Sequence, residues 1–107
     1  MGERVKEQLP FLQLLTISGS KQVAALLDTI SDDQVAAVCS VFKNICLKNI
    51  PISRRDLSLL LRKKKYFILL TSGETSPSEK LSIIKKEAKL IIQILKKIID
   101  EVVDLLE

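Results

Sequence analysis

The C-terminal part of the chain carries an apolar repeat that continues without a break. Aliphatic residues recur at alternating spacings of three and four, which places them at the a and d positions of successive heptads. We call this set the seam: Leu81, Ile84, Ala88, Ile91, Leu95, Ile98, Val102 and Leu105. A seam of this kind predicts a helix that lies against another helical surface.

The start of this helix is marked by several signals. Ser76, Pro77 and Glu79 supply an N-cap, a proline at the first helical position and an acid at the third. One helix over 77–107 would be about 46 Å long at 1.5 Å per residue. A compact domain of this size is roughly 30 Å across, so we expect part of the helix to project beyond it.

Further aliphatic residues widen the apolar surface beyond the a and d positions. Ile92, Ile99 and Leu106 fall at e, and Ile94 falls at g. One interpretation is that the chain's own short helices cover this surface. The interpretation we favour is that the e side packs within the chain and the seam pairs with other copies in a homo-oligomer. A helix lying on a membrane is disfavoured, because its polar face mixes both signs of charge.

The composition predicts an all-α fold. The 107 residues include three glycines and three prolines, and 47% are hydrophobic. Apolar periodicity predicts four short helices before the long one. Cap residues mark two of their starts: a capping box of Ser31 and Gln34, and Ser53 with Asp56 at the third helical position. We place these helices at about 10–17, 22–30, 32–48 and 54–70, after a loose lead-in over 1–9. Residues 1–72 then form a basic domain of short helices and residues 73–107 a long, coiled-coil-like helix, together one compact unit.

Basic charge is concentrated between residues 43 and 65. This stretch has eight cations against one acid, Asp56, within a chain of net charge +4. The cations are Lys43, Lys48, Arg54, Arg55, Arg62, Lys63, Lys64 and Lys65. One interpretation is a solvated face without a ligand, and the other is a surface that contacts nucleic-acid phosphates. Tyr66 is the one aromatic beside this run that we expect to reach a ligand, which is too little for base stacking, so such binding would be directed to the backbone and non-specific.

The residues that usually carry catalysis or bind metals are scarce. The chain has no histidine, and Cys39 and Cys46 lie two helical turns, about 10 Å, apart. That separation is too long for a mutual disulfide, so we predict two buried thiols in a reducing, intracellular compartment. We predict no enzyme activity, no cofactor and no metal site. No uncharged apolar run is long enough to predict a membrane span, and no secretory signal is recognisable.

The chain resembles, at residues 33–53 and with an extent of roughly 10–86, a group of small basic proteins encoded by Polinton/Maverick-type mobile elements and related invertebrate DNA viruses. The shared pattern is a Cys-bearing helix, a Lys-Asn-Ile-Pro-Ile-Ser turn over 48–53, and a basic, Leu-bearing helix, here 54–65. Family members continue into a Gly-Gly, Leu/Pro-rich tail similar to an adenovirus minor core protein, whereas this chain continues into the heptads. The resemblance implies a virion-associated or element-encoded structural protein near packaged DNA.

These observations predict a non-enzymatic, self-associating structural protein with a basic patch for non-specific nucleic-acid contact. The alternative is a protein-interaction adaptor that binds a partner helix, in which case the basic patch is incidental.

Overall fold

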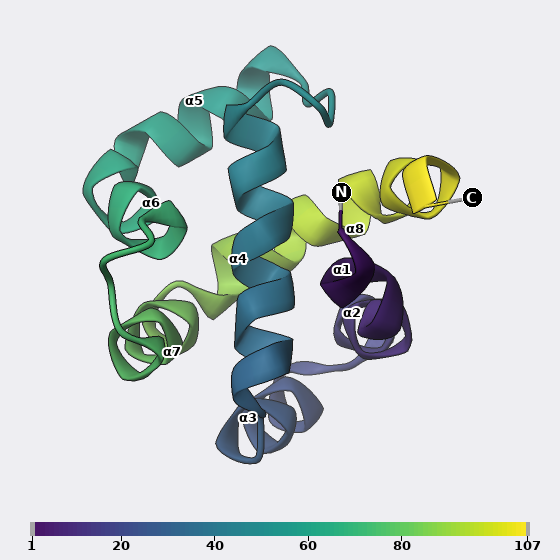
Figure 1. Cartoon of the computed structure of the whole chain (residues 1–107), viewed down its shortest axis with the longest axis vertical. Coiled ribbons are helices and arrows are strands. Elements are labelled where there is room, and N and C mark those ends of the chain that lie inside the picture. Colours follow the sequence, from purple (N-terminus) through teal and green to yellow (C-terminus); the bar gives the residue numbers. More distant parts are fainter. Residues whose placement is uncertain (1, 107) are drawn as a thin grey trace.

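Helix α4 (Asp32–Cys46) runs through the middle of the molecule in the computed structural model, which describes residues 2–106 (Figure 1). The helix begins at the predicted capping box. The Ser31 hydroxyl accepts a hydrogen bond from the Gln34 amide, and the Gln34 side chain accepts one from the Ser31 amide. Val38, Val41 and Phe42 of α4 are fully buried because other helices pack on several sides of it.

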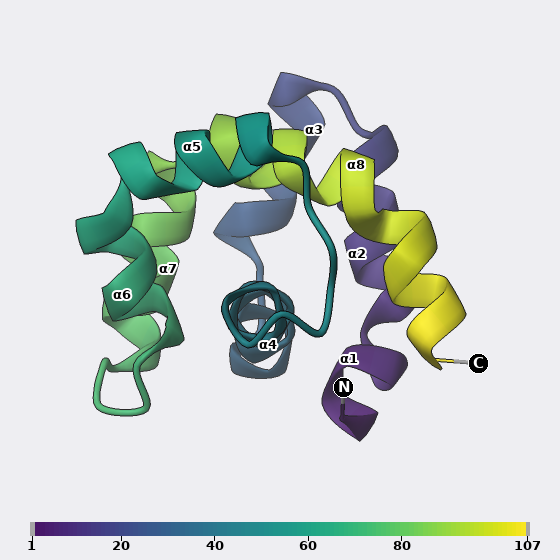
Figure 2. The same ribbon diagram turned by 90° about the horizontal axis from the view of Figure 1, so that it is seen from above.

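The other helices form an arch around α4 (Figure 2). Helices α6 and α7 stand on one side of α4, α1 and α2 stand on the other, and α5 and α8 cross between the two sides. Their bounds are α1 Glu3–Glu7, α2 Leu9–Ile17, α3 Ser20–Asp28, α5 Arg54–Arg62, α6 Lys64–Thr71, α7 Pro77–Lys86 and α8 Ala88–Leu106. The all-α prediction is confirmed, since every regular element within residues 2–106 is a helix.

One hydrophobic core joins the two parts of the chain. Its members range from Val5 in α1 to Val102 in α8, on both sides of residue 72. Aliphatic side chains dominate the core, together with the ring pair of Phe42 and Phe67, whose centroids are 5.2 Å apart. The lead-in predicted over 1–9 is wrong for the described residues, because Val5 is buried and α1 packs on α4.

The single helix predicted over 54–70 breaks at Lys63. In a continuous helix, Lys63 and Lys64 would lie between Leu60 and Phe67 on the buried face. The break removes this conflict, because both lysines are exposed while Leu60 and Phe67 remain buried. Lys63 donates its amide to the Leu60 carbonyl, three residues back, as the last turn tightens.

The long helix predicted over 77–107 breaks at Glu87 into α7 and α8. The molecule measures 31 × 31 × 26 Å, shorter than the roughly 46 Å that the unbroken helix would need. The prediction that this helix projects beyond the domain is therefore wrong. The break lets α7 pack on α4 and α6 while α8 packs on α2. Within residues 2–106, no helix is long and apolar enough to cross a membrane.

Candidate nucleic-acid interface

Helix α5 presents its arginines to solvent. Its start is fixed by Ser53, whose hydroxyl accepts a hydrogen bond from the Asp56 amide at 3.1 Å. Asp56 and Leu60 are buried, so Arg54 and Arg62 lie on the opposite, exposed side of the helix. They are about 12 Å apart along the helix axis at 1.5 Å per residue. Two cations at this spacing can each reach a different phosphate of one nucleic-acid strand.

Lys48 is held in an uncommon backbone conformation just after α4. Its φ is 63°, and it is the one non-glycine residue among those described with a positive φ. The Lys48 amide bonds to the Ile45 carbonyl, and the Asn49 amide bonds to the Asn44 carbonyl. This pair of bonds is a Schellman end, in which glycine usually occupies the position of Lys48. The chain therefore keeps a cation at a position that is sterically costly for it.

The break at Lys63 exposes the most basic segment of the chain. Lys64 and Lys65 begin α6 and are exposed, and Arg62 ends α5 beside them. Lys63 is partly engaged, because its Nζ lies 3.5 Å from Oε1 of the nearly buried Glu87. Burial of the Glu87 side chain is compensated in part by this contact.

All eight predicted cations are exposed, and we call them the basic surface. They lie along α5, at its two ends and at the C-terminal end of α4, with Lys43 in the last turn of α4 (Figure 1). Among the described residues, Lys63 is the one member within ion-pair distance of an acid. The charge of this surface is therefore almost unopposed.

The one acid within the basic stretch, Asp56, is directed inward. Its Oδ1 accepts a hydrogen bond from Lys97 Nζ of α8 at 2.7 Å, and its side chain is almost completely buried. The hydrogen bond from Lys97, supported by Ser53, holds the pKa of Asp56 below its usual value against the opposing effect of burial. Asp56 thus fastens α5 to α8 and leaves the outer face of α5 positive.

Tyr66, the aromatic beside the basic stretch, already has a partner. Its hydroxyl accepts a hydrogen bond from Lys86 Nζ at 2.6 Å, and the same Nζ lies 4.7 Å from the ring centroid. This contact lowers the pKa of Tyr66 and raises the pKa of Lys86. The sequence offered no signal for this pair, which joins α6 to α7.

The seam lies mostly inside the chain's own core. Five members are buried: Ile84, Ile91, Leu95, Ile98 and Val102. Leu81 and Ala88 are half-buried against the core, and Leu105 is exposed. The buried members contact helices of the same chain, so this structure leaves little of the seam for a second copy.

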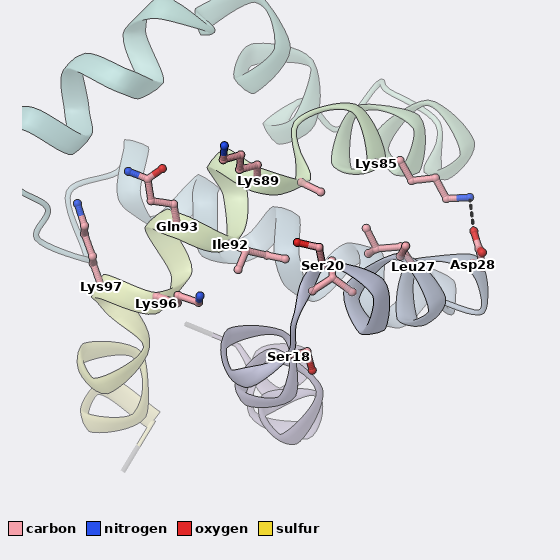
Figure 3. A pocket seen from close by; sticks show the side chains of 13 residues that line it. Ser18, Ser20, Leu27, Asp28, Lys85, Lys89, Ile92, Gln93, Lys96 and Lys97 are labelled. Carbon is pink, nitrogen blue, oxygen red and sulfur yellow. Dashed lines mark ion pairs between the residues drawn. The ribbon is translucent and has the colours of Figure 1, made fainter.

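A groove of about 820 Å³ separates α3 from α8 (Figure 3). Ile92 and Leu27 form part of its apolar floor, and lysines of α7 and α8 stand around it. Two of these lysines already have acid partners. Lys85 Nζ is 3.5 Å from Asp28 Oδ1, and Lys97 binds Asp56. This groove is consequently less strongly charged than the basic surface.

The two cysteines differ in their surroundings. Cys39 is buried, which raises the pKa of its thiol to about 11, whereas Cys46 at the end of α4 is exposed. The sequence predicts burial of both thiols, and this prediction is wrong for Cys46, the last residue of α4. Across residues 2–106, no three side chains of the His, Cys, Asp and Glu types come together to hold a metal ion.

A second groove, beside the basic surface, was not predicted from the sequence. It has a volume of about 580 Å³ and lies between α4, α5 and α6. Leu57, Leu61 and Ile68 border it and remain exposed. The one signal that the sequence offers for this groove is the density of leucines in α5, at Leu57, Leu60 and Leu61.

Comparison with known proteins adds no relative to this description: no family model, curated protein or solved structure matches the chain.

Proposed function

We propose that the chain is a non-enzymatic structural protein whose basic surface binds the phosphate backbone of nucleic acid without sequence preference. The observation that carries the proposal is the unopposed charge of the basic surface. Eight cations are exposed, and one of them, Lys63, lies within ion-pair distance of an acid. The buried Asp56 carboxylate is paired with Lys97 of α8 and does not offset the charge of these cations. Arginine and lysine contacts to phosphate supply the sequence-independent part of nucleic-acid affinity.

Two further features agree with backbone binding. The arginines of α5 project from a helix, so their spacing is fixed. Fixed spacing favours contacts to particular phosphates of a strand over diffuse electrostatic attraction. Tyr66 is engaged by Lys86, so no exposed aromatic beside the basic surface is available to stack on bases. The resemblance to proteins of Polinton/Maverick-type elements supports a role near packaged DNA.

Self-association is part of the proposal, through a surface other than the seam. Because five seam residues are buried within the chain, a second copy would have to bind elsewhere. The exposed leucines of the second groove also support the alternative function, an adaptor that binds a partner helix.

Binding to two unrelated duplex DNAs, measured by fluorescence anisotropy, tests the proposal. The double variant Arg62→Gln/Lys65→Gln removes two exposed cations of the basic surface. A matched control, Lys6→Gln/Lys21→Gln, removes the same charge from α1 and α3. We expect about tenfold weaker binding for the first variant, at roughly 0.5–1 kcal/mol per contact, and little change for the control. Equal loss in both variants would mean that net charge alone governs binding and would refute the proposal.

A further inference from the structure

The second groove combines an apolar lining with basic edges. Its floor includes Phe42 and Phe67, which are buried. Three aliphatic side chains at its border remain largely in solvent: Leu57 is 45% exposed, Leu61 58% and Ile68 55%. Large apolar groups gathered around a hollow mark an interaction site more often than scattered ones do. We call this site the α4–α6 groove.

The chemistry of the occupant follows from the edges of the groove. Lys48 and Lys64 belong to its lining, and neither has an acid within ion-pair distance among the described residues. The remaining cations of the basic surface lie on the same elements. An occupant that complements this groove presents an aliphatic side chain to the apolar lining and negative charges to the lysines. It must also be small enough to enter a groove of about 580 Å³.

The last two turns of α8 have this chemistry. Asp100, Glu101 and Asp104 are exposed, and Leu105 is 50% exposed. Glu101 and Leu105 lie four residues apart, so they stand on the same side of the helix, with Asp104 next to them. Acids at a helix C-terminus are disfavoured by the helix dipole, so a cationic partner at this end would be stabilising. We call residues 100–106 the acidic end.

The acidic end of one molecule cannot fill its own groove. Buried Ile98 and Val102 anchor α8 in the core. Figure 2 shows the end of α8 and helix α6 on opposite sides of α4. We therefore propose that the acidic end of one copy docks in the α4–α6 groove of a second copy, with Leu105 between Leu57, Leu61 and Ile68. Such a head-to-tail contact builds rings or open chains. This inference rests on the self-association in the proposed function, and it identifies the two surfaces through which the copies associate.

Sedimentation of the intact protein tests the contact. The interface is small, so we expect a dissociation constant of about 100 µM, and the mean mass should rise between roughly 10 and 500 µM. Leu105→Asp and Leu61→Asp each place a charge in the contact at an exposed position, and each variant should remain monomeric. Ile17→Asp on α2 is the matched control, because Ile17 is 80% exposed and belongs to neither surface. The control should associate like the natural protein.

Mixing the two monomeric variants gives the sharpest result. Leu105→Asp retains an intact groove, and Leu61→Asp retains an intact acidic end. In a 1:1 mixture, the acidic end of the Leu61→Asp variant can dock in the groove of the Leu105→Asp variant. No other contact is available, so the mixture should form dimers and nothing larger. A monomeric natural protein, a monomeric mixture, or single variants that associate like the control would each overturn the inference.

The thiol of Cys46 gives a second readout in the natural protein. Cys46 lines the α4–α6 groove and is exposed, whereas Cys39, with a pKa of about 11, is protonated near neutral pH. Alkylation of Cys46 should slow several-fold over the same concentration range, and an unchanged rate would count against docking in this groove. Both aspartate variants keep every cation of the basic surface. Monomeric variants that still bind DNA are therefore the expected result. A natural protein that binds DNA but does not assemble would refute this inference and leave the DNA-binding claim standing, whereas assembly without DNA binding would refute the DNA-binding claim alone.

Discussion

Lys63 Nζ lies 3.5 Å from Glu87 Oε1, and these are the two residues at which long predicted helices break in two. The ion pair thus joins the turn between α5 and α6 to the turn between α7 and α8. Helix α6 begins after the first turn and helix α7 ends at the second, and these two helices pack on each other and on α4. A contact between two single residues therefore joins the two helix breaks that the sequence did not predict.

We predict a measurable coupling between these two residues. A double-mutant cycle with Lys63→Ala and Glu87→Gln should give about 0.5–1 kcal/mol, because the carboxylate is nearly buried while the lysine is half-exposed and screened. The same cycle on Lys85 and Asp28, at an equal 3.5 Å, should give less, because Lys85 is as exposed as Lys63 but the Asp28 carboxylate is well exposed. Urea unfolding of the four variants in each cycle measures the two values. A larger coupling for the exposed pair would contradict the role assigned to Glu87.

The placement of the seam in the core predicts unequal effects along it. Leu95→Ala should lower the free energy of unfolding by about 2–5 kcal/mol, because Leu95 is fully buried and the substitution leaves a cavity. Leu105→Ala should cost less than about 1 kcal/mol, because half of that side chain is already in solvent. Urea unfolding checks both values. Equal losses at the two positions would mean that the seam is covered by another molecule.

The Asp56–Lys97 contact predicts a specific pH dependence. Because the folded state lowers the pKa of Asp56, the contact stabilises the protein above the unfolded pKa of about 4, and the gain disappears as pH falls through the folded value. Asp56→Asn should therefore cost about 1–2 kcal/mol at neutral pH, with the half-exposed lysine reducing the charge contribution. The cost should vanish in strong acid. Asp100→Asn, at an exposed position, is the control, and thermal unfolding from pH 2 to 7 is the measurement.

Lys48 offers a test that separates stability from binding. Lys48→Gly should raise the free energy of unfolding by about 0.5–1 kcal/mol, because glycine adopts a positive φ without steric cost. Lys43→Gly removes the same charge from the last turn of α4 and should lower stability by about 1 kcal/mol. Both variants lose one cation of the basic surface. Both should therefore reduce the salt dependence of DNA binding by about one unit of slope. A destabilised Lys48→Gly protein would show that the lysine side chain itself holds the turn.

The starts of α4, α5 and α7 could be predicted from the sequence because their determinants are local. Ser31, Ser53 and Ser76 each accept the predicted hydrogen bond from an amide three residues later. The breaks at Lys63 and Glu87 could not, since lysine and glutamate are good helix formers and carry no stop signal. Tertiary packing places these turns, and the heptad spacing continues across Glu87 as if it were helical.

The candidate site was predictable in charge but not in shape. All eight cations were identified from the sequence and are exposed. The inward turn of Asp56 depends on Lys97, 41 residues away along the chain. The α4–α6 groove depends on the break at Lys63, which separates Leu61 from Ile68. Both features depend on how distant segments pack, which a local sequence pattern does not predict.

The salt dependence of DNA affinity tests the central claim most directly. A labelled duplex should be titrated with the intact protein at 50, 100 and 200 mM salt. If the basic surface makes four or more phosphate contacts, the dissociation constant should rise about a hundredfold or more over this range. A second duplex of unrelated sequence should give the same slope. No binding at 50 mM salt, or a change of less than about threefold, would contradict the account.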